Sequence, residues 1–126
     1  MKLRFDQNSL RLRVKKSDLE KLRVQNFIEE TVHFPNGEFG FHLSISDQVM
    51  EVIAAMKPSS IQVSIPSSIA LQWISNDEVG IYHTIQFGKH SLDIIIEKDF
   101  PCKDRPEEDQ SDSFTILSER NKSKQC

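Results

Sequence analysis

The sequence predicts a mostly β domain of the α+β class, a pseudo-two-fold barrel built from two strand-strand-helix-strand-strand units with short helices. Three observations predict it. Apolar and polar residues alternate in short runs, which is typical of strands with one buried face. The pattern of residues 9–14 recurs in residues 60–65, an offset of 51. From residue 100 onward few residues can form a core. We therefore expect one domain over 1–99, made of repeats 1–46 and 47–98, and an acidic extended tail over 100–126.

The first unit contains four expected strands and one helix. In chain order we expect strands over 2–5 and 10–15, a helix over 17–24, and strands over 28–34 and 39–45. Ser17 followed by Glu20 has the spacing of a capping box, which predicts where the helix begins. The Asn36-Gly37 pair predicts a tight hairpin between the last two strands.

The second unit follows the same order. We expect strands over 52–56 and 60–65, a helix over 67–74 after Pro66, and strands over 79–87 and 92–98. The offset of 51 places Trp73 against Leu22 and Val79 against Ile28. Residues 49–56 also fit a helical stripe, and the repeat favours the strand.

The composition indicates a globular chain with one core, since 37% of the 126 residues are hydrophobic and 28% are charged. No apolar run approaches the roughly 20 residues of a membrane helix, and residues 1–6 lack the apolar region of a secretory signal. The two cysteines, Cys102 and Cys126, form no disulfide framework. We therefore expect a cytoplasmic protein without a membrane partner.

Two resemblances add to this interpretation. The segment Ser60–Pro66, a short helix and the turn Asn76-Asp77-Glu78-Val79 resemble the AbrB/SpoVT type of swapped-hairpin barrel. Two such units in one chain resemble the tandem MraZ-like arrangement or a double-psi barrel. The resemblance implies DNA binding by basic residues of the first hairpin. Residues 1–13, with the later segments 97–102 and 107–109, are also similar to a small bacterial family of unknown function, which implies no activity.

Basic residues gather on the expected outward side of the first hairpin. They are Lys2, Arg4, Arg11, Arg13 and Lys15. Residues 1–46 contain eight Lys and Arg against six Asp and Glu, whereas residues 47–98 contain three against six. Such a face binds phosphates when it is free, and it is only a solvated surface when carboxylates such as Glu29, Glu51 or Glu97 pair with it.

The candidate function is accordingly a small non-enzymatic binding module, with AbrB-like DNA binding or regulation as the named possibility and nucleic acid or another anion as partner. The alternative is a protein-interaction or structural domain without nucleic-acid binding. The oligomeric state is open. Surface charge distinguishes the two functions, because a contiguous positive face favours an anionic partner and neutralised arginines favour the alternative.

The sequence provides no catalytic or metal-binding motif, so we expect no enzyme, cofactor or metal site. No Gly-x-Ser-x-Gly elbow occurs, and the four glycines do not form a phosphate loop. The four histidines lack ligand spacing, so we expect them on sheet surfaces or half-buried. The aromatic residues at apolar-patterned positions are expected in the core: Trp73, Phe27, Phe34, Phe39, Phe41 and Phe87. In the tail, Phe114, Ile116 and Leu117 can dock on the body, and the acidic residues 107–112 can cover the basic hairpin.

Overall fold

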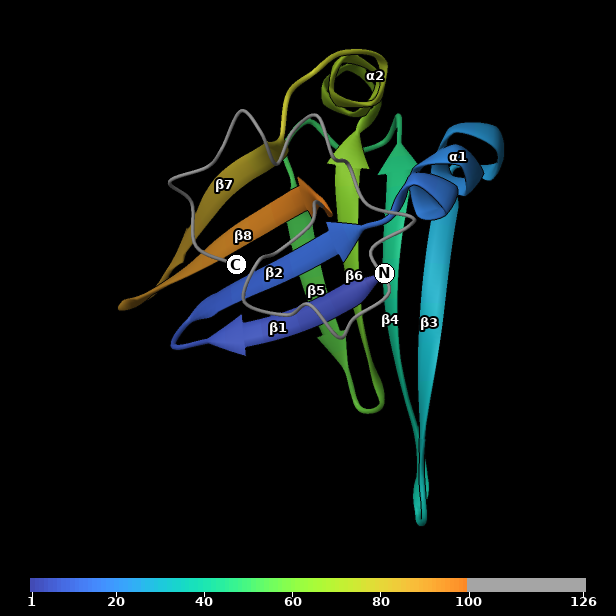
Figure 1. The fold of residues 1–126 in the computed structure, drawn as a ribbon. Coiled ribbons are helices and arrows are strands. Elements are labelled where there is room, and N and C mark those ends of the chain that lie inside the picture. Colours follow the sequence, from blue (N-terminus) through green and yellow to red (C-terminus); the bar gives the residue numbers. More distant parts are fainter. Residues whose placement is uncertain (100–126) are drawn as a thin grey trace, which may run out of the picture.

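The computed structural model describes residues 1–99 as eight strands and two helices (Figure 1). The elements are β1 (Lys2–Asp6), β2 (Ser9–Val14), α1 (Lys16–Gln25), β3 (Phe27–Phe34), β4 (Gly37–Ser46), β5 (Ile53–Lys57), β6 (Ser60–Pro66), α2 (Ser67–Ser75), β7 (Gly80–Phe87) and β8 (His90–Lys98). The expected α+β class is confirmed. The competing helix over 49–56 does not form, because β5 begins at Ile53 and the residues before it are not helical. The predicted tail lies outside the described residues.

The strands form two four-stranded sheets, called sheet A and sheet B. Sheet A has the order β1-β2-β8-β7, and sheet B has the order β3-β4-β6-β5. In each sheet two antiparallel hairpins meet through a parallel pair, β2 with β8 and β4 with β6. The strands of sheet A run obliquely across those of sheet B, and both helices lie at one end of the sheets (Figure 1). The predicted barrel is not confirmed, because the two sheets do not close and each keeps two edge strands.

Helix α1 begins two residues earlier than a capping box with Ser17 as its N-cap predicts. Its N-cap is Lys15, and the backbone N–H of Lys15 donates to Asp18 Oδ2 at 3.0 Å. The capping carboxylate is therefore Asp18, because an acceptor three residues after the N-cap reaches back to its N–H group. Glu20, the predicted capping residue, instead pairs with Arg23 one turn along the exposed face. The helix ends at Asn26, whose φ of 68° is the left-handed conformation common at this position.

The two halves of the described chain have the same order of elements. The first residues of the helices, Lys16 and Ser67, are 51 residues apart, whereas the strands that follow them begin 53 apart, at Phe27 and Gly80. The connection after α2 is longer than the single residue after α1. The alignment at 51 is therefore wrong beyond the helices. Ile28 corresponds to Ile81, and both residues are buried.

The core lies between the two sheets and beneath the helices. Its fully buried members come from the central strands and both helices, and they include Leu12, Leu43, Val63, Ile96, Leu22 and Trp73. Trp73 has an exposed fraction of 0%, as predicted, and its indole N–H donates to the carbonyl oxygen of Val79 at 3.2 Å. Leu22 is buried at the matching position of α1. Each helix thus contributes one large side chain to the same core.

Three aromatic residues expected in the core are exposed instead. Phe27 pairs with Ser44 on the side of sheet B that faces away from the core. Phe34 lies an even number of residues from the buried Ile28 on β3, and Phe87 lies an even number from the buried Ile81 on β7. Both phenylalanines therefore point to the core side of their sheets. Both lie at the hairpin ends farthest from the helices, and they are 55% and 48% exposed. Figure 1 shows the β3–β4 hairpin extending beyond sheet A, so no strand of the other sheet covers this end.

Candidate functional site

Four of the five predicted basic residues share one face of sheet A. The β1–β2 register pairs Lys2 with Arg13 and Arg4 with Arg11, directly across the hairpin. Leu3 and Leu12 alternate with them and point to the core, so the four cations lie on the opposite side. Lys15 is not part of this set, because it follows β2 and serves as the N-cap of α1.

Glu97 lies among these cations from the neighbouring strand. The parallel β2–β8 register places Arg13 beside Glu97. Glu97 Oε1 lies 3.4 Å from Arg11 Nε and 4.0 Å from Arg13 Nε, and Glu97 Oε2 accepts a hydrogen bond of 2.9 Å from the Tyr82 hydroxyl. The Glu97 side chain is only 4% exposed. A buried carboxylate needs such partners, so the two arginines satisfy this charge.

Gly80 leaves room for Glu97 at the end of β7. The two residues are paired across the β7–β8 ladder. A Cβ atom at position 80 would lie 2.7 Å from the carbonyl oxygen of Ile96 and 2.9 Å from Cγ of Glu97. Both separations are closer than a Cβ atom tolerates, so a side chain at position 80 would displace the Glu97 carboxylate.

The other two cations of this face, Lys2 and Arg4, differ in whether a carboxylate lies beside them. Lys2 Nζ lies 3.3 Å from Asp99 Oδ2, and the backbone N–H of Asp99 donates to the carbonyl oxygen of Val14 at 2.7 Å. Asp99 thereby continues the line of β8 beside β2 and carries a buried carboxylate. Arg4 is exposed, and the contacts within residues 1–99 include no ion pair for it.

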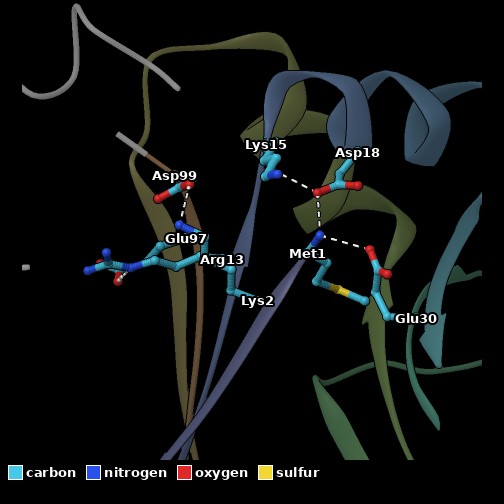
Figure 2. A network of polar contacts seen from close by, with 8 residues as sticks. All are labelled: Met1, Lys2, Arg13, Lys15, Asp18, Glu30, Glu97 and Asp99. Carbon is cyan, nitrogen blue, oxygen red and sulfur yellow. Dashed lines mark hydrogen bonds and ion pairs between the residues drawn. The ribbon is translucent and has the colours of Figure 1, made fainter. Parts of the chain in front are cut away.

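The α-ammonium group of Met1 forms the centre of a second charged cluster, at the junction of β1 and α1 (Figure 2). It lies 2.7 Å from Asp18 Oδ2 and donates to Glu30 Oε1 at 3.0 Å. The same Asp18 oxygen accepts from the Lys15 backbone N–H. The Met1 side chain is buried in the core. The cluster therefore links β1, α1 and β3, and so joins the two sheets.

Lys98 is buried at the end of β8 on the core side. Its Nζ donates to the carbonyl oxygen of Asn76 at 2.7 Å and lies 5.8 Å from the centre of the Trp73 ring. Burial lowers the pKa of Lys98 below its ordinary 10.5, while the carboxylates of Asp77 and Glu78 oppose this shift. A lysine that bonds a carbonyl just after α2 stabilises the C-terminal end of that helix.

Sheet B presents an uncharged version of the same arrangement. Its parallel pair places Ser44 beside Ser64, and their hydroxyl oxygens are 3.1 Å apart. Ser64 lies 51 residues after Arg13, and Glu97 lies 53 residues after Ser44, so the serine pair of sheet B occupies the same place in its parallel ladder as Arg13 and Glu97 do in sheet A. The charged cluster around Glu97 thus has no counterpart at this position of sheet B. Two residues before Ser44 on β4, His42 Nδ1 lies 3.2 Å from Glu29 Oε2.

The described residues include a polar hollow and two paired histidines, but no cluster of metal ligands. Within residues 1–99 no three His, Cys, Asp or Glu side chains gather as metal ligands. His33 and His42 lie on the outer face of sheet B, where each pairs with a glutamate. A polar hollow at the β1–β2 turn is lined by Asp6, Gln7, Asn8, Ser9, Ser91 and Asp93. Polar groups that line it bond to other groups of the protein: Asn8 donates to the carbonyl oxygen of Ser91, and Asp93 accepts from the Thr84 hydroxyl.

Together, the fold and these clusters define a small two-sheet α+β domain in which most charged groups of the sheet A face are bound to one another. The chain belongs to the Family of unknown function (DUF7009), whose model matches residues 1–116. The comparison with curated proteins found no match, and the comparison with solved structures found none. The AbrB-like and MraZ-like resemblance is not confirmed. Neither helix in residues 1–99 is long and apolar enough to cross a membrane.

Sequence reasoning named Glu97 as a partner for the cations but missed other members of the clusters. Asp99 lies just beyond the expected end of β8, and Tyr82 reaches Glu97 only because β7 pairs with β8. Asp18 could have been found, because it is the acid three residues after the N-cap. No sequence pattern indicated the role of Met1, since its partner Glu30 comes from the other sheet.

Proposed function

We propose that this protein is a small non-enzymatic protein-binding module that uses the exposed apolar surface of the β3–β4 hairpin. This surface, called patch B, consists of Val32, Phe34 and Phe39. Val32 pairs with Phe39 across the hairpin, and Phe34 lies two residues further along the same face. Val32 and Phe34 are 44% and 55% exposed, although both point to the core side of sheet B.

Patch B is the observation that supports this function best. Exposed aromatic side chains on a projecting hairpin lose water at a large free-energy gain when a partner covers them. Single exposed apolar residues are ordinary on protein surfaces, but here they adjoin one another on a hairpin that extends beyond the other sheet (Figure 1). Association through patch B therefore needs no rearrangement of the fold.

The charges of sheet A support this alternative over nucleic-acid binding. Glu97 lies between Arg11 and Arg13, and Asp99 lies beside Lys2, so the face holds two buried carboxylates for its four cations. A protein that binds DNA through phosphates needs several cations free to replace counterions. Arg4 is the cation for which the described residues provide no ion pair, which is a small basis for such binding.

AbrB-like DNA binding is kept as the second candidate because of Arg4 and its neighbour Arg11. The two guanidinium groups lie on the same face, and the Arg11 side chain is 31% exposed. An anion could bind between them if Glu97 left Arg11 part of its donor capacity. Arg carries five N–H donors, so one carboxylate does not use them all.

The division of 1–99 into two repeats is also our proposal. The equal order of elements and the equivalent parallel pairs β2–β8 and β4–β6 support it. In this scheme patch B has a counterpart on the β7–β8 hairpin, where Ile85, Phe87 and Leu92 occupy the matching positions. The equivalent apolar ends of the two hairpins thus support the division into two repeats.

The binding function is tested by comparing the wild-type protein with Phe34→Ser as bait in quantitative affinity purification from the source cells. A partner captured by the wild type is purified, and its affinity for both proteins is measured by calorimetry. Phe27→Ser is the matched control, because Phe27 is similarly exposed but on the opposite face of β3. We expect Phe34→Ser to weaken binding at least tenfold and Phe27→Ser to leave it unchanged. Equal loss in both variants, or in neither, would contradict the role of patch B.

Nucleic-acid binding is tested separately with random duplex DNA at low salt. We expect no binding, or weak binding that Arg4→Ala does not alter. DNA binding that falls steeply with salt and disappears in Arg4→Ala and Arg11→Ala would make the second candidate the function. Arg23→Ala is the control for a general loss of positive charge, because Arg23 lies on the exposed face of α1, away from these arginines.

A further inference from the structure

The β7–β8 hairpin carries an uncovered apolar surface of its own, called patch A, which consists of Ile85, Phe87 and Leu92. Ile85 pairs with Leu92, and both pack against the edge of the core. Phe87 points to the same side at the end of the hairpin and is 48% exposed. Its ring centre lies 5.7 Å from that of His90, directly across the hairpin. The core side of sheet A thus extends beyond the part that sheet B covers, just as sheet B extends beyond sheet A at patch B.

We propose that residues 114–117 of the same chain pack on patch A. This segment, Phe114-Thr115-Ile116-Leu117, is the one apolar cluster in the otherwise polar sequence of residues 103–126. The family model matches through residue 116, so the sequence shared by the family continues past β8 and into this cluster. An apolar cluster within the matched region and an uncovered apolar hairpin in the described region are complementary parts of one domain.

The connecting segment is long enough for this contact. Residues 100–113 can span at most about 46–50 Å when fully extended. The return path runs along β8, whose nine residues cover roughly 30 Å. The chain leaves the described region beside β2, where the Asp99 N–H bonds Val14, at the end of sheet A opposite patch A. Residues 114–117 therefore reach the far hairpin of the same sheet without strain.

Charge selects patch A over patch B. The segment just before Phe114 contains Glu107, Glu108, Asp109 and Asp112. Patch A adjoins Lys89 in the β7–β8 turn and His90 after it, whereas the corresponding turn beside patch B has Asn36 and is followed by Glu38. Acidic residues are attracted to the first surface and repelled by the second. This docking would leave patch B free for a partner protein.

The test places a nitroxide spin label beside the segment. Ser113→Cys is labelled in a chain whose native cysteines carry Cys102→Ser and Cys126→Ser, and backbone amide signals are recorded by NMR. We expect loss of the amide signals of residues 85–92 and none at residues 32–39. Phe114→Ser with Ile116→Ser should restore the lost signals. Phe87→Ser should do the same, while Phe34→Ser should not.

Each other outcome overturns the proposal. Loss of signal around Arg4 and Arg11 would instead place the acidic residues on the basic face, and loss at residues 32–39 would place the segment on patch B. Loss that persists in a mixture of chains carrying only the spin label with chains carrying only the isotope label would show that a second copy, rather than the same chain, binds patch A. Unchanged signals throughout would show that the segment does not dock. None of these outcomes depends on a partner of patch B, so the proposed function is judged independently.

Discussion

Glu97 and Arg11, on neighbouring parallel strands, form an ion pair whose Glu97 Oε1 and Arg11 Nε atoms are 3.4 Å apart. The pair exists because β2, from the first half of the chain, lies beside β8, from the second half. The residues that suggest an anion-binding face are thus largely bound to a carboxylate of the same protein. This ion pair supports the proposed binding of a protein partner over the binding of nucleic acid.

Replacing Glu97 by glutamine should destabilise the fold. The substitution keeps the size of the side chain but removes the charge that compensates Arg11 and Arg13. We expect a loss of about 3 kcal/mol in the free energy of unfolding, the low end for a broken buried pair, because Arg11 is partly exposed. Urea unfolding measures the loss. Glu38→Gln, on the exposed β4 surface, is the control, and an equal effect of the two substitutions would contradict a special role of Glu97.

Gly80→Ala should disturb the same cluster without changing any charge. The added Cβ atom would meet Glu97 Cγ and the Ile96 carbonyl oxygen, so the strand or the carboxylate must shift. We expect a loss of about 1–3 kcal/mol, as for other overpacked sites. Gly88→Ala tests a glycine with open space around it, where only its φ of 56° opposes a side chain. A crystal structure of Gly80→Ala in which neither Glu97 nor the β7 and β8 backbones have moved would refute the explanation.

The α-ammonium of Met1 should contribute to stability. Chemical acetylation, or residues added before Met1, would remove the charge that lies beside Asp18 and Glu30. We expect unfolding to become easier by about 3 kcal/mol, the scale of a buried charge left without its partner. A double-mutant cycle with Asp18→Asn checks the contact, because the two changes should then be clearly non-additive. Strict additivity would show that the ammonium and Asp18 do not interact.

Trp73→Ala should cost about 3–5 kcal/mol, because it removes a fully buried indole and leaves a cavity. Leu22→Ala, at the matching position of α1, should cost about 2–5 kcal/mol. Thermal and urea unfolding measure both. Leu71→Ala, at an exposed position of α2, is the control and should change stability little. A loss below about 1 kcal/mol for Trp73→Ala would mean that the indole is not a core residue.

Lys98 should make stability rise with pH in the alkaline range. Its pKa is lowered in the folded state by burial, so between that lowered value and 10.5 the unfolded chain binds more protons than the folded one. Stability then increases as pH rises through this interval, and the cost of burying the ammonium is fully present below it. Lys98→Met should lack this increase. As the pH rises through the interval, the wild type should therefore gain free energy of unfolding relative to the variant. A difference that is independent of pH would contradict the shift.

Local patterns in the sequence were enough to predict the elements of this protein and much of its core. Alternation placed Leu10, Leu12 and Val14 on one face of a strand, and the structure buries all three. These features are local, because side-chain direction follows from the backbone period of a strand or helix. Trp73 and Leu22 could be assigned to the core for the same reason. The four cations could likewise be placed together on one hairpin face.

The arrangement of the hairpins, and therefore which charges meet, comes from the tertiary structure alone. Pairing of β2 with β8 brings Glu97 to Arg11, and contact between the sheets brings Glu30 to Met1. The same arrangement leaves Phe34 and Phe87 exposed, since their pattern is that of core residues and their exposure depends on how far each sheet extends past the other. Alternation reports the side of a strand on which a residue lies. Whether that side is covered depends on contacts between segments distant in the chain, which no local pattern encodes.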